Sequence, residues 1–499
     1  MVYFGPSRGC ATCKRRRKKC DEARPSCMRC VTAKRTCGGY ENDEKVVIQQ
    51  YERPDNKPDS TTKSIGRKCS LPVRGRLPGT DILANDNSPI EVPDKAVDEF
   101  ALQAFVYDFC VSSTNQALSR GFLGRLEPRL HRLGWKSDLA KACGLVSFAK
   151  HGISLNRPHL TLRAEKLYQV LVASLADDIQ HPPATLANKE DKALVALLLG
   201  LYEIIAADDL RPSNHNVHAS GVAAMLRVRN SPLHLLQAIQ GGQSLGAFGG
   251  TEHNTGLLTP PIATSPAQAL DPLLSILGPI WERSNGKINT TAEILALRDE
   301  AMQLNDMFSK WEEAQPNDFK PSTVGSMPGR GVFFDYGVGS WPGKVDTYFD
   351  PYVAGVWNAY RAARLLLIDL ILQLSGIIDD GKDHDAELDV VLHVLEDMLS
   401  SIPYHLAEDV HVFLRDADSH SSIANPGRTV GGLLLMHSMH VVSNLLIINP
   451  QIRSYLKKSL VWMKQNMGIG LASLLANSST LEPNCFASSS MLVLVGLLA

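Results

Sequence analysis

Six cysteines near the start of the chain carry its strongest chemical signal. They form a tandem repeat of one unit, C-x2-C-x6-C, at Cys10, Cys13, Cys20, Cys27, Cys30 and Cys37. A C-x2-C pair lets two thiolates reach one tetrahedral metal ion across a tight turn, and a short helix returns the third cysteine. Six thiolates are too few for two separate four-coordinate sites, but they complete two sites if two sulfurs bridge. The array therefore predicts two zinc ions held by six cysteines.

Two other cysteine chemistries fit this array less well. A disulfide framework requires export, and residues 1–9 lack the apolar core of a signal peptide. An iron–sulfur cluster uses four cysteines at a different spacing. We therefore expect metal ligation in a soluble, intracellular protein.

Six consecutive basic residues, Lys14 to Lys19, lie between the second and third cysteines. Like charges at helical spacing repel, so the run requires anions nearby. Two Zn²⁺ and six thiolates sum to −2, and nucleic-acid phosphates are a second source. Residues 1–40 hold eleven Lys or Arg and two acids, a net charge of +9, whereas the remaining residues hold 40 bases and 50 acids, or −10. Residues 1–40 therefore form a basic head, and the remaining residues form an acidic body. This asymmetry predicts a polyanionic partner for the head. Nuclear import is a second role for such a basic run.

These features together resemble the fungal Zn2Cys6 binuclear-cluster transcription factors. The resemblance rests on the six cysteines, the basic residues after Cys13, Pro25 between the two units, and the Cys37-Gly-Gly-Tyr exit. It implies two short helices joined by a loop, with Cys10 and Cys27 bridging the two zinc ions. It also implies a nuclear protein that binds double-stranded DNA and regulates transcription.

The same resemblance assigns the DNA contacts. Four basic residues match the family's positions at one, three, four and six after the second cysteine, namely Lys14, Arg16, Arg17 and Lys19. A helix through this segment would enter the major groove. By that match Arg16 and Arg17 lie nearest the base edges, and Arg17 pairs with O6 and N7 of a guanine in a CGG-type triplet. The other basic residues grip phosphate and set the register on DNA.

Residues 41–95 predict a flexible linker. They contain six prolines and abundant Asp, Asn, Ser and Lys, with little apolar periodicity. An apolar run begins at Val46, but Pro54 and Pro58 end any helix before two heptads form. The sequence thus shows no convincing coiled coil, and the oligomeric state stays open.

The remaining chain has helical periodicity. Apolar residues recur with a period of 3.6 at Leu388, Val391, Leu392, Leu395, Met398 and Leu399. Comparable stripes run through 99–118, 164–175, 192–207, 216–229, 271–281, 290–313, 351–374, 429–447 and 451–475. Few segments alternate with period two, so we predict a large all-α domain over 96–499, with loop insertions at about 240–268 and 314–347.

Several phrases in this domain resemble the family's fungal-specific regulatory domain. They occur in the family's order: ALLLGLYEII (196–205), HASGVAAML (218–226), WNAYRAARLLL (357–367), SIPYHL (401–406) and MGIGLASLLA (467–476). The resemblance implies a regulatory role for the domain. Any small-molecule effector is left open.

No catalytic motif stands out in the body, so we predict no enzyme activity. GVGSWPGK (337–344) has the wrong glycine spacing for a phosphate loop and lacks its Ser or Thr. KDHDAELD (382–389) precedes an amphipathic stripe and is typical of a helix start. His437 and His440 lie in an apolar helix without a third metal ligand. The apolar runs are too short to span a membrane.

The predicted function is a zinc-dependent, sequence-specific regulator of RNA polymerase II transcription. Double-stranded DNA and transcriptional co-regulators are the expected partners. An enzyme that carries a zinc head for targeting is one alternative, and an RNA-binding protein is another. RNA recognition usually needs exposed aromatic residues for base stacking, and the head offers only Tyr3, Phe4 and Tyr40. Because the family often controls neighbouring biosynthetic genes, we expect a fungal pathway or gene cluster as the target; the sign of regulation stays open.

Overall fold

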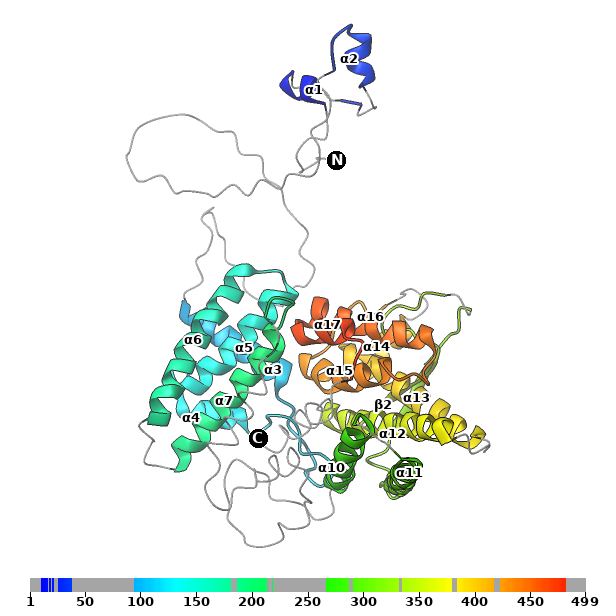
Figure 1. The fold of residues 1–499 in the computed structure, drawn as a ribbon. Helices are drawn as coiled ribbons and strands as arrows, with labels where there is room; N and C mark the ends of the chain where they lie inside the picture. Colours follow the sequence, from blue (N-terminus) through cyan, green and yellow to red (C-terminus); the bar gives the residue numbers. More distant parts are fainter. Residues whose placement is uncertain are drawn as a thin grey trace. The chain divides into compact units, whose positions relative to one another are not determined.

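The computed structural model divides the chain into two compact units, Met1–Asn87 and Ser88–Ala499. The structure describes residues 10–16, 18, 20–21, 26–37, 94–180, 186–211, 213, 218, 266–286, 290–331, 334–378, 384–416 and 422–481. Residues 41–93 of the expected linker, the helical stripe at 216–229 except residue 218, and residues 240–265 of the expected loop lie outside the described residues. The last residues of the expected linker and of the expected loop are helical instead, because helices begin at Asp94 and at Pro266. Each unit is described by itself below, and Figure 1 labels the elements.

The described part of the N-terminal unit contains two five-residue helices, α1 (Ala11–Arg15) and α2 (Met28–Thr32). The expectation placed the first helix after Cys13 and through the basic run, but α1 instead begins directly after Cys10 and ends at Arg15. The reason is the ligand geometry, because two cysteines three residues apart on one helical turn point their sulfurs to the same side. Helices this short are unstable alone in water, so the cysteines must hold them.

The larger unit is mostly helical, as predicted. In chain order, its described helices are α3 (Asp94–Phe109), α4 (Leu126–Leu133), α5 (Asp138–Ser154), α6 (Pro158–Gln180), α7 (Leu186–Ala206), α10 (Pro266–Ser284), α11 (Thr291–Glu313), α12 (Pro351–Ile378), α13 (Asp385–Leu406), α14 (Val410–Arg415), α15 (Thr429–Ser443), α16 (Pro450–Met467) and α17 (Gly470–Asn477). The stripe at 99–118 forms a helix only as far as Phe109. The stripe at 451–475 is two helices, because Gly468 ends α16 in a left-handed conformation.

The helices form two neighbouring groups around one continuous hydrophobic core. In the first group α5 packs against α3, α6 and α7, and these helices lie side by side in Figure 1. In the second group α12 packs against α11, α13 and α15. Most side chains of α12 are buried, because it is covered by neighbours on several sides. A helix that is apolar nearly all round is expected at the centre of such a group.

Close backbone contacts and polar side chains join the two groups. A Cβ at Gly468 would lie 2.4 Å from the carbonyl oxygen of Lys150, so this position requires glycine both for its φ of +74° and for space. From the segment before α15, Arg428 donates hydrogen bonds to the carbonyl oxygens of Tyr107 and Cys110. These carbonyls belong to the C-terminal end of α3, where a helix leaves acceptors unpaired. The junction is therefore capped as well as packed.

Residues 314–347, expected to be a loop, contain an antiparallel hairpin. Strand β1 (Ser322–Met327) pairs with β2 (Gly343–Thr347), with Ser322 opposite Thr347 and a register shift between Thr323 and Gly325. The strands are short and contain glycine, so they carry little period-two signal. Their stability comes from packing against α13.

The predicted apolar stripe of α13 is only partly buried. The helix predicted from this stripe is confirmed, and Val391, Leu395, Met398 and Leu399 lie in the core. Leu388 is 42% exposed and Leu392 is 66% exposed, so the stripe is not buried along its whole length. Helical periodicity places side chains on a face, but only the neighbouring elements decide whether that face is covered.

Candidate metal centre and nucleic-acid interface

The structure brings the sulfurs of all six cysteines together. They form two groups of four: Cys10, Cys13, Cys20 and Cys27, and Cys10, Cys27, Cys30 and Cys37. Within each group the Sγ atoms all lie within 4.8 Å of one another. Both groups contain Cys10 and Cys27, which are the two residues that the family resemblance assigns as bridges. Six sulfurs thus provide two four-coordinate sites.

The sulfur spacing fits tetrahedral zinc. Cys10 Sγ lies 3.6 Å from Cys27 Sγ and 3.8 Å from Cys30 Sγ. Cys13 Sγ lies 3.8 Å from Cys27 Sγ. Four sulfurs bound at about 2.3 Å to one zinc ion are about 3.8 Å apart. The donor set and its dimensions therefore match the expected cofactor.

Backbone hydrogen bonds repeat between the two halves of the cluster. The N–H of Cys13 donates to Cys10 Sγ at 3.4 Å, and the N–H of Cys30 donates to Cys27 Sγ at 3.3 Å. The N–H of Cys10 donates to Cys20 Sγ, and the N–H of Cys27 donates to Cys37 Sγ, both at 3.4 Å. Donors directed at sulfur favour the negatively charged thiolate. The sequence duplication is thus also a structural one.

The thiolates need a cation to remain charged in this environment. Cys10, Cys13, Cys27 and Cys30 are buried and form the small core of this unit. Burial raises the pKa of the Cys13 and Cys27 thiols above the usual range. Bound zinc supplies the positive charge that keeps such thiols deprotonated. In small domains with such ligands, metal binding and folding are coupled.

One polar contact between the halves was not predicted from the sequence. Thr12 Oγ1 in α1 donates to the carbonyl oxygen of Thr36 at 3.1 Å, which links the start of the first half to the end of the second. Thr12 lies inside the first C-x2-C pair, so its position next to the ligands is the only signal that could have indicated this role.

The structure describes the basic residues only in part. Lys14 belongs to α1, and Arg16 follows the helix as an exposed residue, with its N–H bonded to the carbonyl of Thr12. Arg15 and Lys18 are also exposed. Arg17 and Lys19 lie outside the described residues, as does Pro25. The described part of the run therefore presents positive charge to solvent next to the cluster.

Comparison with known proteins places this unit in a family. Residues 8–45 match the fungal Zn(2)-Cys(6) binuclear cluster domain. The chain is also 43% identical over 422 residues to transcription factor dbaG of Emericella nidulans, and the alignment covers 83% of this chain and 100% of that protein. The chain belongs to the fungal Zn2Cys6 transcription factors.

Shorter matches involve two other fungal regulators. White-opaque regulator 2 of Candida albicans is 47% identical over 45 residues, which are 9% of this chain and 10% of that protein. Sterol uptake control protein 2 of Candida albicans is 43% identical over 70 residues, which are 14% of this chain and 10% of that protein. No solved structure is significantly similar.

Family membership confirms several predictions from the sequence. The protein is a transcription factor with a zinc-binding cysteine cluster, and the family is not one of enzymes. The cluster domain also implies DNA as a partner. Among the described helices, none is long and apolar enough to cross a membrane.

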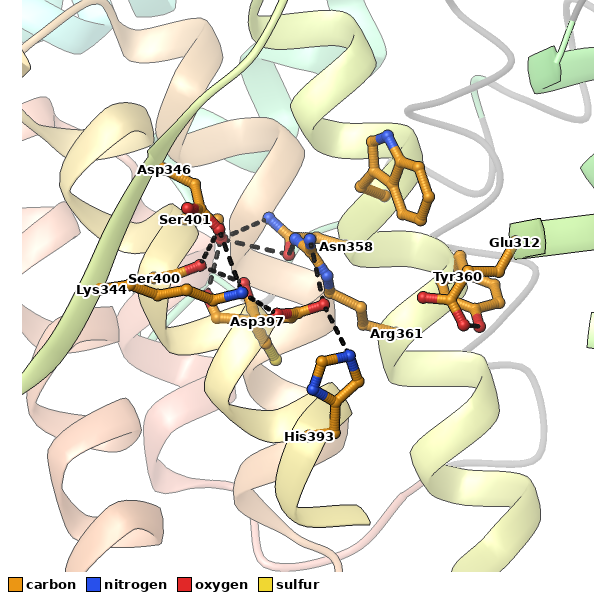
Figure 2. A network of polar contacts seen from close by, with 12 residues as sticks. Glu312, Lys344, Asp346, Asn358, Tyr360, Arg361, His393, Asp397, Ser400 and Ser401 are labelled. Carbon is orange, nitrogen blue, oxygen red and sulfur yellow. Dashed lines mark hydrogen bonds and ion pairs between the residues drawn. The ribbon is translucent and has the colours of Figure 1, made fainter. Parts of the chain in front are cut away.

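The helical domain contains a buried polar network that the sequence analysis missed. Arg361 of α12 is 1% exposed and donates hydrogen bonds to Tyr348 Oη at 2.8 Å and Asn358 Oδ1 at 3.1 Å. Its Nη2 lies 4.0 Å from Asp397 Oδ2 of α13. Figure 2 shows Arg361 between α12 and α13, with Asp397 facing it. A signal was present, because Asn358, Arg361 and Arg364 recur every three residues within a helical stretch that is otherwise mostly apolar.

The same network explains why GVGSWPGK is not a phosphate loop. Lys344, its last residue, lies on β2 and pairs with Asp397, as Figure 2 shows. Burial alone would lower the pKa of Lys344, but the bond to Asp397 outweighs it and raises this pKa. Asp346 accepts hydrogen bonds from Thr323 Oγ1 and Ser400 Oγ, both at 2.6 Å. These contacts attach the hairpin to α13.

The two histidines of α15 have structural partners. His437 and His440 are both buried, and His440 Nδ1 lies 3.0 Å from the carbonyl oxygen of Leu475. Within the part of the chain that the structure describes, only the cysteines group with metal-ligand geometry. The histidines therefore belong to the packing of α15.

Proposed function

We propose that this protein is a nuclear, zinc-dependent regulator that recognises a CGG-type site in double-stranded DNA. We further propose that it controls a fungal pathway or biosynthetic gene cluster, as the family resemblance leads us to expect. The observation that carries the proposal is the pair of four-sulfur sites sharing Cys10 and Cys27, directly beside six consecutive basic residues.

In this proposal all six cysteines are zinc ligands. Cys10 and Cys27 bridge the two ions, Cys13 and Cys20 complete one site, and Cys30 and Cys37 complete the other. The support is the set of Sγ–Sγ distances within each group of four, which match tetrahedral coordination. Two zinc ions held by these cysteines would join the two halves, because Cys10 and Cys27 belong to both groups of four.

The residues that follow the second cysteine contact DNA. Arg17 pairs with a guanine in the major groove, and Arg16 lies beside it near the base edges. Lys14 and Lys19 bind phosphate and set the register. The net charge of +9 over residues 1–40 supports a polyanionic partner. The same basic run fits a nuclear-import signal, which supports a nuclear location.

The rest of the chain divides into two further regions in this proposal. Residues 41–95 are a flexible linker, and residues 96–499 are a regulatory domain that contacts transcriptional co-regulators. The support for this division is the composition of the linker and the separate hydrophobic core of the helical domain.

Genome-wide chromatin immunoprecipitation, compared with the transcriptome of a deletion strain, tests the proposal. We expect the bound sites to contain CGG triplets and to lie upstream of genes whose transcripts change on deletion. Binding without a CGG preference, or at sites whose neighbouring transcripts do not change, would contradict it.

A further inference from the structure

The first turns of α13 hold aliphatic side chains in water. Leu388 is 42% exposed and Leu392 is 66% exposed, and they stand four residues apart, so they share one face of the helix. Ile377, in the last turn of α12, is 65% exposed. A single exposed leucine is ordinary, but two on one helical face form a continuous apolar ridge.

The part of α13 next to these leucines is already fixed in the domain. Val391, Leu395 and Met398 belong to the hydrophobic core, and Figure 2 shows Asp397 and Ser400 directed at the polar network with β2 and α12. Rotation of α13 to bury Leu392 would break these contacts. The exposed leucines are therefore a stable property of the fold.

Charge accumulates around this ridge. Residues 384–396 contain four acids and no Lys or Arg, a net charge of −4, compared with −10 for everything after residue 40. Asp385, Asp389 and Glu396 are exposed residues of α13 itself. Acidic residues at the start of a helix are common, because they interact favourably with the helix dipole. This explanation accounts for the acids of α13 but not for the exposed leucines beside them.

The negative charge beside the ridge distinguishes between the proteins that could bind there. A second copy of this chain would bring two acidic faces together, and juxtaposed like charges oppose association. A partner with basic side chains beside an apolar groove would satisfy both the leucines and the acids. An amphipathic helix with anchors at i and i+4 is a common way to fill such a groove.

We propose that the α13 ridge, formed by Leu388 and Leu392 with Asp385, Asp389 and Glu396, docks into an apolar groove flanked by Lys and Arg on a transcriptional co-regulator. This inference rests on the proposed function, because the ridge would be the surface through which the DNA-bound protein acts on transcription. Since α13 is held in the core, its conformation is formed before binding, and the entropy cost of docking is small.

The test uses the full chain in a strain that carries a reporter under a CGG-containing promoter. Regulation is measured as the ratio of reporter output with and without the protein, and promoter occupancy is measured by chromatin immunoprecipitation. We expect Leu388→Ser with Leu392→Ser to lose most of the regulation while occupancy and protein abundance stay unchanged. The matched control is Leu162→Ser with Val170→Ser on α6, where both residues are also exposed, and it should keep full regulation.

A second variant tests the charged rim. Asp389→Asn with Glu396→Gln should lose part of the regulation, and Asp389→Glu should retain it, because only the former removes negative charge. Unchanged regulation in the leucine variant, or a change in occupancy in either variant, would overturn the proposal. If the unaltered protein does not occupy the CGG promoter at all, the proposed DNA-binding function fails instead, so the two failures are distinguishable.

Discussion

The two units of this protein are held together by different interactions. In the N-terminal unit the buried residues of the described part are almost all cysteines, and its helices are five residues long. The Ser88–Ala499 unit has a core of leucines, aromatic residues and other apolar side chains around α5 and α12. A short segment cannot bury enough apolar surface to fold alone, so it depends on ligand bonds, whereas a large domain does not. The comparison predicts that each unit responds to a perturbation that leaves the other unchanged.

Removing metal should give the largest difference between the units. A fragment of residues 1–45 should bind about two zinc ions and unfold on chelation, since zinc in such domains contributes on the order of 10 kcal/mol. A fragment of residues 96–499 should remain helical under the same chelator. Native mass spectrometry and circular dichroism measure both effects.

A different zinc content would contradict this prediction. One zinc ion per fragment, retained after Cys27→Ser, would rule out a bridged cluster. Cys143→Ser in the full chain is the control, because Cys143 is buried in α5, away from the six-cysteine array in sequence.

Breaking the buried polar network should affect only the large unit. Arg361→Ala would leave Asp397 with Lys344 and the exposed His393 as its remaining partners, and it should lower the free energy of unfolding by about 3–5 kcal/mol, as loss of one buried charge partner does. Urea unfolding followed by tryptophan fluorescence measures this change. Zinc content should stay the same. His393→Ala is the matched comparison, because it removes a solvent-exposed partner of the same Asp397 carboxylate, at 3.9 Å, and an exposed ion pair should change the free energy of unfolding little.

Acidification should also destabilise the large unit, through His405. Burial lowers the pKa of His405 to about 4, and its ring nitrogens lie 3.0 Å from the Gly431 carbonyl oxygen and 3.0 Å from Asn358 Nδ2. The unfolded chain, with a histidine pKa of about 6.5, binds this proton more readily between those two values. Stability is therefore lost as the pH falls from about 6.5 to about 4, by about 3 kcal/mol from this residue.

The role of His405 can be isolated from the other histidines. Unfolding midpoints at pH 7 and pH 5 should differ less in His405→Gln than in the unaltered protein. An equal pH dependence in the two proteins would show that other groups are responsible.

The smallest expected effects separate two basic residues of the N-terminal unit. Arg17→Ala should cost about 1–3 kcal/mol of binding and remove the preference at one base pair, if its guanidinium pairs with guanine. Lys14→Ala should weaken binding to all sequences alike and reduce the salt slope by about one unit, because a lost phosphate contact releases about one fewer counterion.

A salt titration on a CGG-containing duplex and a scrambled duplex distinguishes these roles. Both variants keep all six cysteines, so their zinc content is the internal control. Equal loss of affinity on both duplexes for Arg17→Ala would show that Arg17 binds phosphate rather than a base.

The sequence by itself determined the metal chemistry of this protein. Cysteines at a C-x2-C-x6-C spacing favour metal ligation over a disulfide framework or an iron–sulfur cluster. Because the unit occurs twice and supplies six thiolates, two four-coordinate ions require two bridging sulfurs. The periodic stripes also predicted the helices, since a period of 3.6 over many residues is a local signal that needs no knowledge of neighbours. The capping box at Thr290 and Glu293, where α11 begins, is another such local signal.

Only the tertiary structure decided which faces of those helices meet other elements. Leu388 and Leu392 share the period of Val391 and Leu395, yet they stay in water because nothing in the described chain covers the start of α13. The β1–β2 hairpin and the contact between Arg361 and Asp397 likewise join residues far apart in the chain. Burial and ion pairing depend on which elements are neighbours in space, and the local sequence pattern does not contain that information.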